Sequence, residues 1–381
     1  MDIPHGDGRT GTCNSVLPPH FSLQNMTPFA RATNWSPLPF IGLVLLIAAT
    51  VSGCSGVFST TDSPSGTANI PGVATVPPGY DFPADDSLTV ATWNVENFVD
   101  EYDNPYIDNE WENSPPDDMY ARFKLFIRGV RALDADIVVL QEIESEAFAQ
   151  SIAEEHLSDM GYQFFTATES PDWFQNVVLM SRVPLGVVES YSDVVTPIEG
   201  ITTDEGEPAA QSLTNNRIWR ATVHARPDYT VHLVGAHLKA GRDDRDRGWR
   251  VGQVRLLHER FNDLLATTPD ANILVAGDLN SLSDSPELRL LLNDSDRPAP
   301  GSMQQDTGEW NATFIDPLHG RPTFTHPSDN PERQLDYILI NENTQPELVP
   351  GSARVARPLS DAELARFSDH LPVVVTLLTT E

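Results

Sequence analysis

One stretch constrains the fold more than any other, because an apolar run in it ends abruptly in Gly, Asp and Asn: Ile273-Leu274-Val275-Ala276-Gly277-Asp278-Leu279-Asn280-Ser281. The run shows no polar alternation, which predicts a strand covered on both faces. Residues i and i+2 of an extended chain point the same way, so Asp278 and Asn280 can converge above the strand end. A carboxylate can activate a water, and an amide N–H can hold an anionic oxygen. The alternative interpretation is a strand followed by an Asx-type turn.

Other apolar, strand-like segments also carry polar residues at one end. Besides Asp278 and Asn280, the residues in such positions are Asn94, Glu142, His237, Asp336, Asp369 and His370. Each has a local alternative; Glu142, for example, could cap the following helix. Together they form a set of carboxylates, amides and imidazoles without cysteine. Such a set suits Mg²⁺ or Mn²⁺ better than a tetrahedral structural zinc.

The N-terminal region carries an export signal rather than part of the fold. The apolar run Leu38–Thr50 follows Arg31 and is too short to span a bilayer comfortably, but has the length of a signal-peptide core. The Val51-Ser52-Gly53-Cys54 sequence after it resembles the lipobox of bacterial lipoproteins, in which the cysteine is acylated. An ordinary secretory signal and an uncleaved anchor are the alternatives. We therefore predict an N-terminal extension and lipoprotein signal over residues 1–54, with Met26 as an alternative start.

Composition indicates how the rest of the chain is organised and which partners its charge disfavours. Residues 55–86 are rich in Ser, Thr, Pro and Gly, which predicts a flexible tether before a folded domain over 87–381. That domain contains neither cysteine, because the two lie at Cys13 and Cys54. The formal net charge of −31 argues against binding of DNA or RNA through a broad basic surface, but not against phosphate binding through metal ions. Solubility outside the cell is the simpler explanation of this charge.

Within the domain, apolar spacing predicts helices over 120–133, 147–160 and 285–292, and a fourth running from a basic cluster at 242–250 to about residue 265. Strands are predicted at 87–97, 135–142, 176–182 and 185–191, the last returning antiparallel, and a hairpin at 217–225 and 229–238. Residues 192–215 are expected to be an insertion or long loop. The basic cluster is interpreted as a self-neutralising surface, with a phosphate-binding rim as the alternative. The acidic segment 100–118 is expected to be a surface loop, where no regular ligand spacing supports a calcium site.

Six motifs now support a resemblance to a known group. The chain resembles the endonuclease/exonuclease/phosphatase superfamily, which includes DNase I-like nucleases, neutral sphingomyelinases and inositol-polyphosphate 5-phosphatases. The motifs occur in family order between Ser87 and Leu378: Trp93-Asn94-Val95-Glu96-Asn97, Gln141-Glu142, His237-Leu238-Lys239, Gly277-Asp278-Leu279-Asn280, Leu335-Asp336-Tyr337 and Ser368-Asp369-His370. The resemblance implies an α+β, four-layer α/β/β/α sandwich, in which helices flank two packed mixed β-sheets and the site lies at one edge.

The resemblance also implies roles for individual residues. Glu142 would be the principal ligand of Mg²⁺ or Mn²⁺, with Asn94 and Asp369 close by. Asp278 would orient or deprotonate the attacking water, and Asn280 would hold the phosphate. His370, oriented by Asp336, would face the phosphate, and His237 would be a second imidazole donor. Weaker expectations of substrate contact fall on Asn176, Arg182 and Thr323, with strand capping as the alternative for Asn176.

The predicted function is that of a metal-dependent phosphoesterase, most simply an exported nuclease or phosphodiesterase that cleaves P–O bonds by in-line attack of water. A phosphatase or phospholipase C-type hydrolase of inositol phosphates or sphingomyelin-like head groups is the alternative. A non-catalytic binding module on the same fold is a third hypothesis. The expected partners are nucleic acid or another phosphodiester, and a membrane through a lipid on Cys54. We expect a monomer in the cell envelope, facing the periplasm or the exterior.

Overall fold

The computed structural model describes residues 76–170, 173–211, 216–300 and 310–380. This part of the chain forms two six-stranded sheets and one two-stranded sheet. It contains no helix that is both long and apolar enough to cross a bilayer. The predicted signal segment and Cys54 lie outside the described residues, as do residues 55–75 of the predicted tether.

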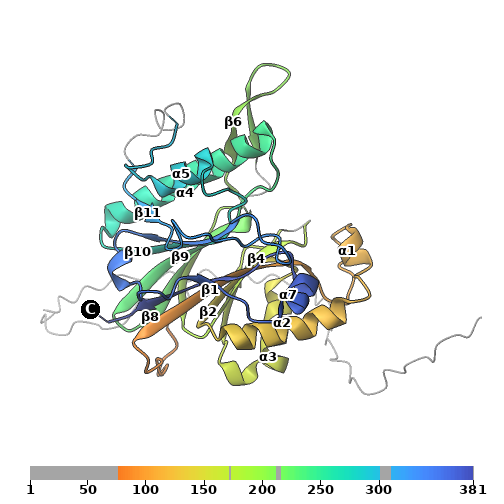
Figure 1. Cartoon of the computed structure of the whole chain (residues 1–381). Helices are drawn as coiled ribbons and strands as arrows, with labels where there is room; N and C mark the ends of the chain where they lie inside the picture. The colour runs from red at the N-terminus through yellow and green to blue at the C-terminus, as the bar shows by residue number, and fades with distance from the viewer. Residues whose placement is uncertain (1–75, 171–172, 212–215, 301–309, 381) are drawn as a thin grey trace, which may run out of the picture. The chain divides into compact units, whose positions relative to one another are not determined.

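The first sheet has the strand order β13-β14-β1-β2-β4-β3 and mixes parallel and antiparallel pairs. β1 is parallel to β2, whereas β14 and β4 run antiparallel to their neighbours. Its strands are β1 (Ser87–Phe98), β2 (Ile137–Ile143), β3 (Phe164–Ala167), β4 (Asn176–Ser181), β13 (Arg354–Val355) and β14 (Val373–Leu378). One face packs against α2 (Met119–Leu133), α3 (Glu146–His156) and α7 (Asp361–Phe367), and the short α1 (Glu110–Asn113) lies in the connection after β1 (Figure 1).

The second sheet has the order β11-β12-β10-β9-β8-β5, with β9 and β10 parallel. Its strands are β5 (Leu185–Ser190), β8 (Ile218–Arg226), β9 (Tyr229–His237), β10 (Asn272–Asp278), β11 (Phe314–Ile315) and β12 (Asp336–Asn341). On its outer face lie α4 (Asp244–Thr267) and α5 (Pro286–Leu292), as Figure 1 shows. The small sheet of β6 (Thr196–Thr202) and β7 (Pro208–Gln211) packs on α4.

A continuous apolar core joins the inner faces of the two large sheets. Val90 and Val139 of the first sheet belong to the same buried cluster as Leu274 and Ile338 of the second. Separate buried clusters lie between each sheet and its helices. This confirms the predicted four-layer α/β/β/α sandwich, and it explains why the run that ends at Asp278 is apolar on both sides.

Two predicted segments take a different structure from the one expected. Residues 185–190 form β5, which pairs with β8 in the second sheet rather than returning along β4. The segment expected to be a long loop forms β6 and β7, and Gly252 of α4 lets Pro197 approach so closely that a Cβ would lie 2.0 Å from its carbonyl oxygen. The end of the predicted tether contacts the domain, because Tyr80 packs edge-on against Phe164.

Candidate active site

Strand ends from both sheets meet at a single edge. The carboxyl ends of the parallel pairs β1–β2 and β9–β10 lie beside the amino ends of β12 and β14. Hydrogen bonds and short contacts connect the polar residues there, which are Asn94, Glu142, His237, Asp278, Asp336, Asp369 and His370. The structure therefore brings together the strand-end residues predicted from the sequence.

Asn94 connects the two sheets at this edge. Its Nδ2 donates to Glu142 Oε1 and to Asp278 Oδ2, both at 3.1 Å. Its Oδ1 accepts the backbone N–H of Glu96 at 3.0 Å, which fixes the orientation of the amide. Because Asn94 and Glu142 belong to the first sheet and Asp278 to the second, one buried amide sets the spacing between the two carboxylates.

The backbone at this edge adopts a conformation that non-glycine residues rarely take. Among the described residues, six other than glycine have positive φ, and four of them lie here: Glu96, Asn97, Glu142 and Asn280. Each such residue costs about 1–3 kcal/mol and persists where the surrounding structure holds it in place. Gly277 has φ 153°, and a Cβ on it would lie 1.8 Å from the Ala236 carbonyl oxygen, which accounts for the Gly before Asp278.

Three carboxylates line the side of the site formed by the first sheet. Glu142 accepts the backbone N–H of Asn97 at 3.2 Å through Oε2, and its side chain is only 17% exposed. Glu96 accepts the backbone N–H of Asp369 at 2.9 Å. Burial raises the pKa of Glu96, and the charges of Asp369 and Glu142 also raise it, against the opposing effect of Arg122. Carboxylates gathered in this way favour a bound cation.

Asp278 lies deeper than these groups and is almost fully buried. Its Oδ1 accepts the backbone N–H of Asn280 at 2.9 Å, while Oδ2 lies 3.8 Å from Nε2 of both His237 and His370. Burial raises the pKa of Asp278 to about 7, against the opposing effect of the charge on His370. A carboxylate with a pKa near neutrality is well matched to proton exchange with water.

The two imidazoles beside Asp278 carry different charges. His370 Nδ1 donates to Asp336 Oδ2 at 2.7 Å. Burial alone would lower its pKa, but the carboxylates of Asp336 and Asp278 outweigh burial and raise the pKa of His370 to about 10. Burial lowers the pKa of His237 well below its usual value, and the charges of Arg217 and His370 act in the same direction. The site therefore holds one imidazolium and one neutral imidazole.

Two groups of three possible metal ligands, with ligand atoms within 4.8 Å of one another, occur among the described residues. They are Asp278, Asp336 and His370, and His326, Asp369 and His370. In the first group, Asp336 and His370 already bond to each other. In the second, His326 Nε2 lies 3.1 Å from Asp369 Oδ2. Glu96, Glu142 and Asp369 are not one of these groups, but they offer oxygen ligands of the kind that Mg²⁺ and Mn²⁺ prefer, so their chemistry fits such an ion.

The other residues predicted to contact substrate take different positions relative to the site. Asn280 lies at the site, although its Nδ2 also donates to the Leu238 carbonyl at 3.0 Å. Asn176 is buried at the start of β4 and donates to the Glu144 carbonyl at 2.5 Å, a capping contact. Arg182 is not brought to the site, because β4 runs antiparallel to β2 and places this residue at the far end, paired with Asp134 at 2.6 Å. Thr323 lies half-buried in the connection before β12.

Two of the four arginines in the basic cluster at 242–250 pair with carboxylates. Arg247 pairs with Asp244 at 3.1 Å. Arg250 is buried and pairs with Glu287 at 2.8 Å. These pairs favour the interpretation of a self-neutralising surface over that of a phosphate-binding rim.

Sequence reasoning did not single out Glu96, His326 or Arg217. Glu96 is part of the motif Trp93-Asn94-Val95-Glu96-Asn97, so this motif is the sequence signal that could identify it as a site residue. Arg217 comes just before β8, and its guanidinium carbon lies 5.9 Å from the ring centroid of Trp173. Its charge acts on both Glu142 and His237. Nothing in the mixed composition before residue 217 indicates that this arginine lies beside the catalytic edge.

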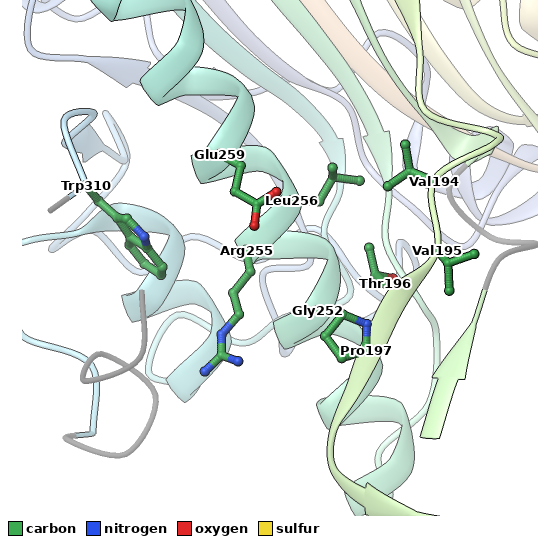
Figure 2. Close-up of a pocket in the computed structure, with 9 residues that line it drawn as sticks. All are labelled: Val194, Val195, Thr196, Pro197, Gly252, Arg255, Leu256, Glu259 and Trp310. Atoms are coloured by element: carbon green, nitrogen blue, oxygen red, sulfur yellow. The ribbon is translucent and has the colours of Figure 1, made fainter. Parts of the chain in front are cut away.

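One cavity in the described structure lies away from the proposed catalytic residues. It has a volume of about 280 Å³ and lies between α4, β6 and Trp310. Figure 2 shows Arg255 and Glu259 of α4 on one side, and Val195 and Pro197 on the other. The interacting carboxylates, amides and imidazoles lie instead at the strand ends, so we place the candidate active site there.

One family model and several solved structures are similar to this chain. The sequence model of the endonuclease/exonuclease/phosphatase family matches residues 91–370. Similar solved structures include D. rerio TDP2 complexed with single strand DNA product (15% identity, 77% of this chain and 99% of that chain, TM-score 0.47), an AP endonuclease from Archaeoglobus fulgidus (16%, 76% and 99%, 0.43) and beta toxin from Staphylococcus aureus (15%, 76% and 99%, 0.47). No match is found among curated proteins. Likenesses at these identities and scores say nothing about the substrate.

Proposed function

The chain belongs to the endonuclease/exonuclease/phosphatase family, and from this premise we propose that it is a phosphodiesterase that cleaves nucleic acid with the help of Mg²⁺ or Mn²⁺. One observation carries the proposal. Asn94 holds the acidic side of the site, at Glu142, at a fixed spacing from the buried carboxylate of Asp278. This separates a place for a cation from a place for proton exchange, which phosphoryl transfer to water requires.

The residues of this chain divide the work of the reaction. Asp278, held by Asn94 and by the backbone of Asn280, accepts a proton from the attacking water. His370 is kept protonated by Asp336 and donates from Nε2 toward the phosphate oxygens. Burial keeps His237 neutral, and its Nε2, which lies 3.8 Å from Asp278 Oδ2, provides a second donor when it carries the proton. Asn280 retains one amide hydrogen for the phosphate.

A divalent cation would be held by Glu142 together with Glu96 and Asp369. When bound, it would neutralise charge on the phosphate and stabilise the leaving oxygen. Glu96 is an addition to the ligands expected from the sequence. Asn94 acts instead through its amide nitrogen, which donates hydrogen bonds to Glu142 and Asp278.

Nucleic acid is favoured as the substrate class by the aromatic and cationic pair of Trp173 and Arg217. Trp173 is 38% exposed, and its Nε1 donates to Gln175, which in turn donates to Asn97 beside Glu142. A base can stack on such a ring while a neighbouring guanidinium contacts phosphate. The deciding experiment is an assay of the purified chain with Mg²⁺ against plasmid DNA, single-stranded DNA, RNA, sphingomyelin and an inositol phosphate.

We expect turnover of one or more of the nucleic acids and none of the other two substrates. Hydrolysis of sphingomyelin or the inositol phosphate alone would assign the alternative function, that of a head-group hydrolase or phosphatase. No turnover of any substrate would favour a binding module on the same fold.

Replacing Arg217 with Met should raise KM for nucleic acid about tenfold while changing kcat less, because the guanidinium is proposed to contact phosphate outside the scissile bond. Steady-state kinetics on a short DNA substrate measure both constants. Arg220→Met, three residues later in β8 and paired with Glu189, serves as the matched control. An unchanged KM in the Arg217 variant would contradict this role.

We propose that the chain is exported and held in the cell envelope by a lipid anchor. The apolar run and the Val51-Ser52-Gly53-Cys54 sequence support export and a lipid anchor on Cys54. Mass spectrometry of the mature N-terminus is the direct measurement. An acylated Cys54 is expected, and an unmodified residue at that position would contradict the anchor.

A further inference from the structure

A histidine to which the proposed reaction gives no role borders the proposed cation site. His326 lies in the connection between β11 and β12, and its Nε2 lies 3.1 Å from Oδ2 of Asp369. Its ring packs edge-on against that of His370, with the ring centroids 4.8 Å apart. The side chain of His326 is 18% exposed, whereas that of Asp369 is 44% exposed. His326 therefore contacts the site through a carboxylate that is itself half-exposed.

Main-chain hydrogen bonds hold the turn that carries His326. His326 and Arg333 face each other in an antiparallel bridge, in which each backbone N–H donates to the other's carbonyl at 3.0 Å. The N–H of Ser328 donates to the Asp369 carbonyl at 2.8 Å, and its hydroxyl donates to the Ser368 carbonyl at 2.6 Å. These bonds attach the turn to the segment that precedes β14, so the imidazole is placed beside Asp369 by the backbone.

The side chain of Arg333 decides which ring nitrogen of His326 carries the proton. Arg333 Nη2 lies 2.9 Å from His326 Nδ1. Because a guanidinium has only N–H donors, a hydrogen bond between these two atoms requires Nδ1 to accept. The proton of the neutral ring is then on Nε2, the nitrogen that faces Asp369. The three side chains form one chain of donors that ends on the carboxylate.

We propose that His326 is a positioning residue for the divalent cation: its Nε2–H holds Oδ2 of Asp369 and leaves Oδ1 of the same carboxylate to bind the ion. This inference rests on the proposed role of Asp369 as a cation ligand. Oδ1 lies on the side of the catalytic edge, 3.7 Å from His370 Nε2. A half-exposed carboxylate has several orientations, and fixing one of them before the ion binds lowers the entropic cost of binding.

The same hydrogen bonds keep His326 from binding the ion itself. A histidine binds a metal through an unprotonated ring nitrogen. In His326 the donor of Arg333 occupies Nδ1, and Nε2 carries the proton. Although His326 belongs to one of the groups of possible ligands, it therefore supplies an orienting hydrogen bond rather than a ligand atom.

The test measures Mn²⁺ binding to the purified full chain by calorimetry. His326→Ala should raise the Kd for Mn²⁺ by about 10–100-fold, the usual cost of losing a residue that orients a metal ligand. His326→Gln should stay within about threefold of the wild type, because its amide N–H can still donate to Asp369. His319→Ala, at an exposed histidine in the same connection, is the control and should leave the Kd unchanged. Thermal unfolding without the ion checks that each variant folds.

The protonation of the ring is measured separately. The ¹⁵N chemical shifts of the His326 imidazole, assigned by comparison with His326→Gln, should show a protonated Nε2 and an unprotonated Nδ1. The opposite tautomer would overturn the proposal and leave Nε2 able to bind the ion directly. An unchanged Kd in a folded His326→Ala variant would also overturn it, and so would a His326→Gln variant that binds as weakly as His326→Ala.

Neither measurement requires turnover, so the inference and the proposed function can fail separately. The expected Kd changes in a chain that hydrolyses no nucleic acid would support the inference and contradict the proposed substrate. Hydrolysis of nucleic acid with an unchanged Kd in His326→Ala would overturn the inference alone. A wild-type chain that binds no Mn²⁺ would contradict both.

Discussion

Replacing Asp278 with Asn is expected to lower kcat for phosphodiester hydrolysis by about 10³, because the variant can no longer accept the proton of the attacking water. The amide keeps the size of the side chain and can still accept the Asn280 N–H. Since burial already raises the pKa of Asp278, removing its charge should not unfold the domain. Single-turnover rates of the wild type and the variant measure the effect.

The matched control for this experiment is Asp270→Asn, an exposed residue just before the opposite end of β10. It should retain wild-type turnover. Thermal unfolding of both variants separates lost chemistry from lost structure. A folded Asp278→Asn variant that turns over within tenfold of the wild type would rule out Asp278 as the proton acceptor.

Replacing Glu142 with Gln should produce a loss of similar size, but through the metal. Removing this charge weakens the acidic side formed with Glu96 and Asp369, so the Mg²⁺ concentration that gives half-maximal activity should rise at least tenfold. The amide oxygen can still accept the Asn97 N–H, which keeps the strand end in place. Mg²⁺ titrations of activity measure the shift, which is not expected in the Asp278→Asn variant.

Glu154→Gln is the control for this second experiment, because Glu154 is exposed on α3, the helix that follows β2. It should leave the Mg²⁺ titration unchanged. An unaltered Mg²⁺ requirement in Glu142→Gln would show that Glu142 is not a metal ligand. The group of His326, Asp369 and His370 would then be the favoured metal site.

The catalytic edge was predictable because its chemistry is local to the strand ends. An apolar strand that ends at Asp278 shows both its burial and its polar end in the sequence alone. The same holds for Glu142, whereas His370 comes just before the apolar strand β14. Each pattern is short, but parallel pairing brings carboxyl ends of strands together, so several weak patterns predict one site. The pairing of Asn94 with two carboxylates could not be predicted, because it depends on how the two sheets face each other.

The remaining differences arise from long-range packing. Asn176 and Arg182 flank the same strand, and the antiparallel pairing of β4 with β2 places Asn176, not Arg182, near the end of β2 that carries Glu142. The segment 192–211 has the composition of a loop, and it forms strands because it packs on α4. Glu112 lies in a segment with the composition of an acidic loop, yet it belongs to the short helix α1 and is buried. Composition describes a segment, not the neighbours that the fold supplies.

Metal-dependent hydrolysis is tested with a simple phosphodiester, bis(4-nitrophenyl) phosphate, and the purified wild-type chain before chelation, after chelation and after addition of Mg²⁺ or Mn²⁺. We expect turnover that chelation abolishes and either ion restores. Full activity after exhaustive chelation, or no activity with either ion, would contradict it.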